Sequence, residues 1–349
     1  MTSRMIQPAR VALTRAFMAL VFVTLAGCSF QPDENVWEIS GGIFGTRYQI
    51  NVVLTEDDDR LQDLAQGIEA VLEGVDASMS TWREDSELSA FNRQQDQSTW
   101  FPVSTALFRV LETSNRIAEA SGGAFDITIG PVVNLWGFGP DGRPEQVPLP
   151  DLLAEVHRAT GYANLEFDPD QVAIRARSKQ YLDLSGIAKG YGVDAVAEYL
   201  EGQGVERYLV EIGGEIRVHG RKPDGSAWRL AVEEPSEGDR AINRVVAMDR
   251  YGMATSGDYR NYYEFQGQRY SHTIDPNTGY PVDHKLASVT VVTTTAMEAD
   301  AWATAFTVMG YEASMAFATR NNMAVYFIIR DGDGFRVDHT PAFATYLIQ

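Results

Sequence analysis

Cysteine is almost absent from this sequence of 349 residues, because Cys28 is the only one. The body of the protein therefore has no thiol for a disulfide and no cysteine nucleophile. A zinc site is not indicated either, since the five histidines, at 157, 219, 272, 284 and 339, show no ligand spacing. The Gly-x-Ser-x-Gly motif of many serine hydrolases is also missing. These absences argue against thiol, zinc and serine-hydrolase chemistry.

Positive charge is scarce as well. Twenty-nine Lys and Arg residues face 48 Asp and Glu residues, so the formal net charge is -19. Such a surface repels nucleic acid, and we expect no nucleic-acid partner. Most of the acids, including the run at 57–59, are solvated surface, but the excess leaves carboxylates available for a hard cation. The 44% share of hydrophobic residues indicates a globular chain with enough apolar material for a core.

The one marked apolar run lies near the N-terminus. Residues 16–26 follow a positively charged start and are too few to span a bilayer, which predicts a secretory signal. Leu25-Ala26-Gly27-Cys28 is similar to a bacterial lipobox, in which the cysteine carries lipid after cleavage; a short membrane helix with a chance cysteine is the alternative. We therefore predict a lipoprotein signal peptide at 1–27, a lipid-anchored tether at 28–36 and one domain at 37–349.

This N-terminus also predicts where the protein resides. Several acyl chains on Cys28 would hold it firmly at a membrane surface, facing the periplasm of a bacterial cell envelope. Ser29 is not the aspartate that would argue for the inner membrane, so the sequence leaves the choice of membrane open, and we favour the inner one.

The remaining chain mixes strands and helices without regular alternation. Strands are predicted at 37–54 with a break at Gly41-Gly42 and a bend at Gly45-Thr46, and at 164–167, 172–175, 207–219, 228–233, 244–248, 287–294, 324–329 and 335–337. Residues 262–265 and 269–274 are predicted to form a hairpin across Gln266-Gly267. Helices are predicted at 60–76, 103–120, 152–159, from the bend near 186 to 200, 296–309 and 313–320. Residues 124–139 and 254–259 are expected to be irregular, the second of these as a loop between strands. This order predicts an α+β fold with a mixed, largely antiparallel sheet and packed helices.

The stretch 181–194 has the features of a ligand-binding turn. It runs from a short apolar strand through small residues, among them Gly186, into a predicted helix. The small residues leave the main chain open, so that a phosphate group can approach the amides at the helix start. Asp183 and Lys189 supply one charge of each sign nearby. The alternative is an ordinary connection in which Asp183 caps the helix and the glycines ease packing.

A second candidate site lies in the predicted helix 296–309. Asp300 and Thr304 are four residues apart and therefore share one face of the helix, where both can offer oxygen to one ion. Mg²⁺ keeps waters and accepts phosphate oxygens, so a sparse set of protein ligands suits it. The alternative is that Asp300 complements the helix dipole and Thr304 fills a gap in the core.

Five segments, taken in order, resemble one known family. They are Phe-Asp-Ile-Thr-Ile-Gly-Pro at 125–131, Asp-Leu-Ser-Gly-Ile-Ala-Lys-Gly at 183–190, Thr-Ser-Gly-Asp-Tyr at 255–259, His-Thr-Ile-Asp-Pro-Asn-Thr-Gly at 272–279 and Ala-Asp-Ala at 299–301. From about Gly41 to the end, the chain resembles the ApbE family of flavin transferases. The resemblance implies an ApbE-like, T-fold-related domain that uses Mg²⁺ to transfer the FMN moiety of FAD, releasing AMP. The implied acceptor is a threonine or serine hydroxyl of an envelope flavoprotein such as a redox-pump subunit.

The resemblance also implies roles for single residues. Gly186 offers its carbonyl oxygen to a Mg²⁺ ion whose binding Asp300 and Thr304 complete. The residues expected to contact FAD are Phe44, Trp82, Ala124, Phe125, Asp126, Asp183, Lys189, Ser256, Gly257 and Ile274. Phe44 and Trp82 stand where the family often has methionine and tyrosine, and their rings still suit stacking on an aromatic ligand.

The implied chemistry fits these residue types. Phosphoryl transfer depends on alignment and on charge stabilisation, which Mg²⁺ and Lys189 can supply. The acceptor hydroxyl must lose a proton, and His272 is the candidate base because histidine titrates near neutrality; hydrogen-bonded scaffolding before a turn is its alternative role. Two other functions stay open: an FAD pyrophosphatase that yields FMN and AMP, and a lipid-tethered flavin-binding protein without catalysis.

Overall fold

The computed structural model describes residues 33–140, 147–235, 241–258 and 261–348. The predicted signal peptide at 1–27 and Cys28 lie outside these residues. Within the described ranges, no helix combines the length and the hydrophobicity that a membrane span requires.

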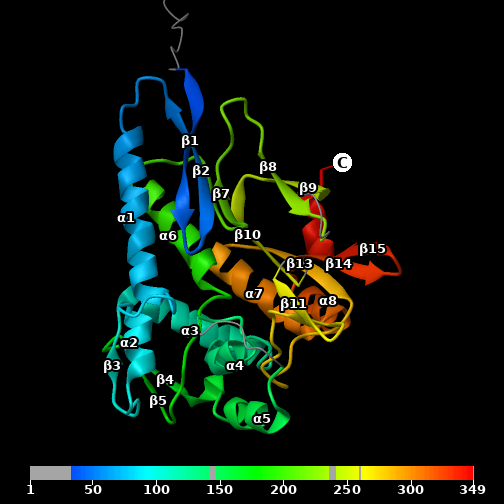
Figure 1. The fold of residues 1–349 in the computed structure, drawn as a ribbon. Coiled ribbons are helices and arrows are strands. Elements are labelled where there is room, and N and C mark those ends of the chain that lie inside the picture. The colour runs from blue at the N-terminus through cyan, green and yellow to red at the C-terminus, as the bar shows by residue number, and fades with distance from the viewer. Residues whose placement is uncertain (1–32, 141–146, 236–240, 259–260, 349) are drawn as a thin grey trace, which may run out of the picture.

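An eight-stranded sheet forms the centre of the molecule, in the order β1-β2-β6-β7-β10-β13-β14-β15 (Figure 1). Its strands are β1 (Glu34–Ile43), β2 (Thr46–Thr55), β6 (Tyr208–Ile212), β7 (Glu215–His219), β10 (Arg250–Gly257), β13 (Leu286–Thr293), β14 (Ala324–Asp331) and β15 (Gly334–His339). Every neighbouring pair is antiparallel. The β-branched strand β13 is buried over nearly its whole length, as an interior strand covered on both faces should be. The predicted α+β fold is confirmed.

Some helices pack against this sheet, and others gather at one end of the molecule (Figure 1). They are α1 (Leu61–Met79), α2 (Glu87–Arg93), α3 (Thr105–Ala120), α4 (Gly130–Leu135), α5 (Pro150–Arg158), α6 (Ala188–Gly202), α7 (Ala296–Met309) and α8 (Tyr311–Arg320), with short 3₁₀ turns η1 (Ile127–Ile129), η2 (Tyr162–Asn164) and η3 (Pro341–Tyr346). Helix α6 contacts β6 and β7, while α7 contacts β10 and β13. The apolar stripe of α1 packs on α6.

Three small sheets complete the described chain. They are β3 (Phe101–Pro102) with β5 (Ala173–Ala176) and β4 (Leu165–Asp168), β8 (Trp228–Glu233) with β9 (Ile242–Met248), and the hairpin of β11 (Tyr262–Phe265) and β12 (Gln268–Ser271). The hairpin predicted across Gln266-Gly267 is confirmed, although its second strand ends at Ser271 and not at Ile274.

Helices α6 and α7 approach each other closely at Gly190. A Cβ atom at this position would lie 2.4 Å from the carbonyl oxygen of Ala296, so only glycine fits the contact without movement of the backbone. The buried carboxylate of Asp194, one turn further along α6, accepts hydrogen bonds from the main-chain N–H groups of Ala296 (3.0 Å) and Met297 (2.9 Å). This carboxylate caps the start of α7 and fixes the two helices against each other.

Two predictions near the N-terminus of the domain were wrong. Strand β1 continues through Gly41, where a break was expected, because the ring of Tyr48 on β2 covers the glycine: a Cβ there would lie 2.4 Å from the Tyr48 hydroxyl oxygen. The chain turns at Phe44 and Gly45, which both have positive φ angles, close to the bend predicted at Gly45-Thr46. Strand β1 also begins at Glu34, inside the predicted tether.

Two further segments differ from expectation, and a third, predicted as sheet, is confirmed. Residues 124–139 were expected to be irregular, but they contain η1 and α4, which starts with Pro131 in its first turn. The segment 254–257 was expected to be a loop, but it belongs to β10, whose polar residues pair with β13 on one side. The predicted sheet segment 207–219 folds back at Gly213-Gly214, where φ is +62° and +107°, into β6 and β7.

Candidate active site

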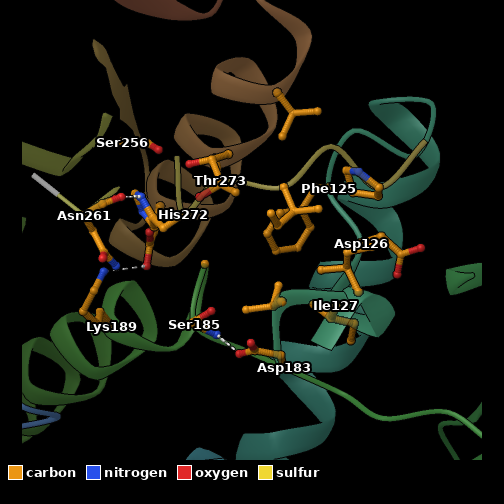
Figure 2. A pocket seen from close by; sticks show the side chains of 18 of the residues that line it. Phe125, Asp126, Ile127, Asp183, Ser185, Lys189, Ser256, Asn261, His272 and Thr273 are labelled. Atoms are coloured by element: carbon orange, nitrogen blue, oxygen red, sulfur yellow. Dashed lines mark hydrogen bonds and ion pairs between the residues drawn. The ribbon is translucent and has the colours of Figure 1, made fainter. Parts of the chain in front are cut away.

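A cavity of about 440 Å³ lies where distant parts of the chain meet. Its lining includes Ala124 to Ile127, Asp183, Ser185, Gly186, Lys189, Gly213, Glu215, Thr255 to Gly257, Asn261, His272 to Ile274, Asp300 and Thr304. Figure 2 shows Phe125, Asp126 and Ile127 on one side and Asn261, His272 and Lys189 on the other, with Ser185 and Asp183 between them. The close approach of α6 to α7 places Lys189 beside Asp300 and Thr304 within this cavity.

Most of the residues predicted for the site from sequence line this cavity. They are Ala124, Phe125, Asp126, Asp183, Gly186, Lys189, Ser256, Gly257, His272, Ile274, Asp300 and Thr304. The structure does not bring Phe44 and Trp82 into the lining. Phe44 occupies the β1–β2 turn with its ring against Gly192, and Trp82 follows the end of α1 with 70% of its surface exposed.

The bend at Gly186 lies against the polar face of α7. A Cβ atom at Gly186 would be 3.3 Å from the Thr304 hydroxyl oxygen and 3.2 Å from the Phe125 ring. Asp300 lines the same cavity, is 5% exposed, and accepts a hydrogen bond from the Gly190 N–H through Oδ2 at 3.1 Å. The two pieces of chain that the sequence analysis singled out therefore meet.

The oxygen atoms at this junction fit a magnesium ion. A carboxylate, a hydroxyl and a main-chain carbonyl are hard donors, and Mg²⁺ takes few protein ligands when a substrate diphosphate supplies others. The described ranges hold no cluster of three or more His, Cys, Asp or Glu side chains spaced for a metal. The hard oxygen donors at this junction suit an ion that shares its coordination with substrate and water.

Lys189 lies between two buried carboxylates. Its Nζ is 2.8 Å from Glu215 Oε1 and 3.9 Å from Asp300 Oδ2. Burial by itself would lower the pKa of Lys189, but the charges of Asp300 and Glu215 outweigh it and hold the pKa above its ordinary value. Burial raises the pKa of Glu215 to about 7, against the opposing effect of Lys189. Burial likewise raises the pKa of Asp300. Lys189 therefore stays protonated and presents positive charge to the cavity.

His272 is held as a neutral ring with one defined tautomer. Its Nδ1 lies 2.9 Å from the carbonyl oxygen of Asn261, and because a carbonyl only accepts, Nδ1 carries the proton. The main-chain N–H of His272 donates to the same oxygen at 3.1 Å. Burial lowers the pKa of His272 below its ordinary value. Nε2 is therefore left as the atom that can accept a proton.

Comparison with known proteins agrees with this geometry. The sequence profile of the ApbE family matches residues 44–327. The chain belongs to the ApbE family. A Haemophilus influenzae relative named FAD:protein FMN transferase is 43% identical over 329 residues, covering 92% of this chain and 94% of the relative.

Solved ApbE structures share the whole described fold. The flavin transferase ApbE from Vibrio cholerae superposes with a TM-score of 0.83 at 41% identity, covering 90% of this chain and 100% of that one. The apo form of the Pseudomonas stutzeri flavinyl transferase ApbE gives a TM-score of 0.82 at 38% identity, covering 90% and 97%. The predicted family membership is confirmed.

Asp126 and Asp183 of this ApbE chain accept hydrogen bonds from different segments. Asp126 Oδ1 accepts from the Thr128 N–H (2.8 Å) and hydroxyl (2.7 Å), and Oδ2 accepts from the Tyr162 N–H (3.0 Å), so this carboxylate organises the loop. Asp183 Oδ1 accepts from the Ser185 N–H at 2.9 Å. Helix α6 begins at Ala188 without a side-chain cap, so the alternative that Asp183 caps it is wrong.

Sequence reasoning missed Glu215, Thr255, Asn261 and Ser185, which also line the cavity of this ApbE protein. Glu215 follows an apolar strand and a Gly-Gly pair, which predicts a turn but not the direction of the next side chain. The hydroxyl of Thr255 forms a hydrogen bond with the hydroxyl of Thr290, with 2.8 Å between the two Oγ1 atoms. Asn261 acts through its main-chain carbonyl, which any residue offers, so no side-chain pattern could have indicated it.

Proposed function

We propose that this protein transfers the FMN moiety of FAD to a threonine or serine hydroxyl of another protein and releases AMP. The observation that carries the proposal is the contact between the Gly186 bend and the α7 face with Asp300 and Thr304. It creates one cavity with an open main chain, a buried ammonium group and hard oxygen donors, which together suit a dinucleotide diphosphate. The names of the ApbE relatives support the same activity.

A magnesium ion would be held by the Gly186 carbonyl, Asp300 and Thr304, and would offset negative charge on the diphosphate. Lys189 adds a fixed positive charge beside that ion. The apolar surfaces of Phe125 and Ile274 line the same cavity and suit the flat rings of FAD. These groups align the substrate before chemistry begins.

The acceptor hydroxyl attacks the phosphorus atom on the FMN side. A bond from that oxygen to phosphorus forms while the bond to the AMP oxygen breaks. The hydroxyl proton goes to His272 Nε2, which the Asn261 carbonyl leaves available by holding the proton of Nδ1. The lowered pKa of His272 keeps this ring neutral, and therefore ready to accept a proton, at pH 7.

The setting of this reaction is part of the proposal. The lipobox-like sequence ending at Cys28 supports a lipid anchor that holds the domain in the bacterial envelope, on the periplasmic side and preferably at the inner membrane. Acceptors would then be envelope flavoproteins, such as subunits of membrane redox pumps. A strongly acidic chain also argues against a nucleic-acid partner.

The test uses lipid-free protein with FAD, Mg²⁺ and a redox-pump subunit purified without flavin. We expect the subunit to gain the mass of one FMN residue, and Asp300→Ala to slow this transfer by roughly 100-fold or more because an ion ligand is lost. Glu298→Gln is the matched control, since Glu298 lies on the same helix but pairs with Arg116 at the surface. Equal rates for native protein and Asp300→Ala would contradict the assignment.

The same experiment separates the alternatives. AMP released without any acceptor, at a rate equal to transfer, would show an FAD pyrophosphatase in which water replaces the hydroxyl. FAD that stays intact for hours with Mg²⁺ and acceptor present would show a flavin-binding protein without catalysis.

A further inference from the structure

Glu215 is a buried acid of the cavity to which the mechanism above gives no role. It is the first residue of β7, directly after the Gly213-Gly214 turn, and only 3% of its surface is exposed. Its Oε1 pairs with Lys189, while Oε2 is buried and has no hydrogen-bond partner among the described residues. Burying a carboxylate oxygen without a partner costs stability, so a structural role alone does not account for this residue.

The position of the Lys189 ammonium group depends on Glu215. The group lies 2.8 Å from Glu215 Oε1 but 3.9 Å from Asp300 Oδ2, so it makes close contact with only one of the two acids. The aliphatic stem runs past the glycine turn, where a Cβ at Gly213 would be 3.5 Å from Lys189 Cδ. The turn before β7 therefore supports both the lysine stem and its carboxylate partner.

We propose that Glu215 is a positioning residue that holds the Lys189 ammonium group away from Asp300, so that the Asp300 carboxylate remains available to a divalent cation. This inference rests on the proposed function, because it concerns the ion expected at Asp300 and Thr304. If Glu215 loses its charge, Asp300 is the other acid within reach of Lys189. The ammonium group then moves into direct contact with Asp300, and a cation must displace it to bind.

A simple count of charges makes a different prediction. Loss of any nearby negative charge weakens cation binding, whether or not Lys189 is present. If Glu215 acts by positioning Lys189, by contrast, its loss weakens cation binding only when Lys189 is present. A double-mutant cycle between Glu215 and Lys189 separates the two explanations, because it measures how far the effect of one residue depends on the other.

The experiment measures Mn²⁺ binding to lipid-free protein by electron paramagnetic resonance with ADP present. ADP carries a diphosphate but no FMN, so the measurement does not depend on turnover. We expect Glu215→Gln to weaken Mn²⁺ binding by about tenfold in the native background and by less than about twofold in Lys189→Met. Glu198→Gln is the control, because Glu198 is a half-exposed acid on α6 that pairs with Arg109 outside the cavity.

The Mn²⁺-binding results test the positioning role of Glu215 separately from the proposed function. Equal weakening in both backgrounds, or no weakening by Glu215→Gln, overturns the positioning role and leaves the proposed function intact. Native protein that binds no Mn²⁺ overturns the metal assignment and this role together. Thermal unfolding monitors the fold of every variant, and Glu215→Met with Lys189→Gln repeats the cycle if either first choice does not fold.

Discussion

The contact between α6 and α7 at Gly190 gives the sharpest structural prediction. Replacing Gly190 with alanine adds a Cβ that would lie 2.4 Å from the Ala296 carbonyl oxygen, 2.7 Å from its carbonyl carbon and 2.8 Å from the Met297 Cα. The shortest of these distances is about 1 Å less than an ordinary contact, and all three partners are backbone atoms of α7. No side chain can rotate away, so the two helices must separate.

Two opposing effects determine how much Gly190→Ala lowers the free energy of unfolding. Overpacking of this kind costs roughly 1–3 kcal/mol, whereas the better helix propensity of alanine returns up to about 1 kcal/mol. All three partners are backbone atoms that cannot rotate away, so the upper part of this range applies, about 2–3 kcal/mol, and the return of about 1 kcal/mol leaves an expected loss of about 1–2 kcal/mol in the free energy of unfolding of Gly190→Ala. Separation of the helices also lengthens the hydrogen bond from the Gly190 N–H to Asp300 and disturbs Lys189, so FMN transfer should fall by more than stability alone explains.

Urea denaturation gives the free energy of unfolding, and FMN transfer is measured below the unfolding range. Gly74→Ala is the matched control: Gly74 lies inside α1 and a Cβ there meets nothing within 4 Å, so alanine should stabilise by up to about 1 kcal/mol. Gly190→Ala protein as stable and as active as native protein would refute the argument that close helix contact builds the site.

Two further predictions concern buried charge. Asp194→Ala leaves Arg217, 3.0 Å away, without this partner and uncaps the N–H groups of Ala296 and Met297, so we expect a loss of about 3–5 kcal/mol in urea denaturation. The pKa of His272 lies below its ordinary value of about 6.5, so its ring stays neutral at pH 6.5. In Glu215→Gln protein at saturating Mg²⁺, where the acid with a pKa of about 7 is removed, the transfer rate should therefore stay level as pH falls from 8 to 6.5 and decline only at more acidic pH. A transfer rate that falls to half of its maximum at or above pH 6.5 would contradict the assignment of His272 as the base.

Much of the fold was predictable because its elements follow strong local patterns. The apolar stripe of α1 and the β-branched run of β13 set their own secondary structure through burial of one or both faces. Strand β10 was missed because its residues 254–257 are small or polar, and it is a strand only through its ladders to β7 and β13. The break predicted at Gly41 failed for a related reason, since the Tyr48 ring on the neighbouring strand covers that glycine.

Within the site, the sequence predicted groups that act through residue type and spacing. Asp300 and Thr304 share a helix face by spacing alone, and the absence of side chains around Gly186 is visible in the chain itself. Phe44 and Trp82 were assigned by resemblance, and the structure leaves both outside the cavity lining. Asn261 could not be predicted, because its contribution is a main-chain carbonyl.

By itself the sequence determined which residue types are scarce, including cysteine and the cationic residues, and it singled out the two stretches around Gly186 and Asp300, since these features depend only on composition and local order. The tertiary structure alone decided that Lys189 lies closer to Glu215 than to Asp300. Ionic contacts fall off with distance over a few ångströms, and those distances are set by how α6 packs on α7 and where the Gly213-Gly214 turn directs β7. No periodicity in the chain encodes that placement.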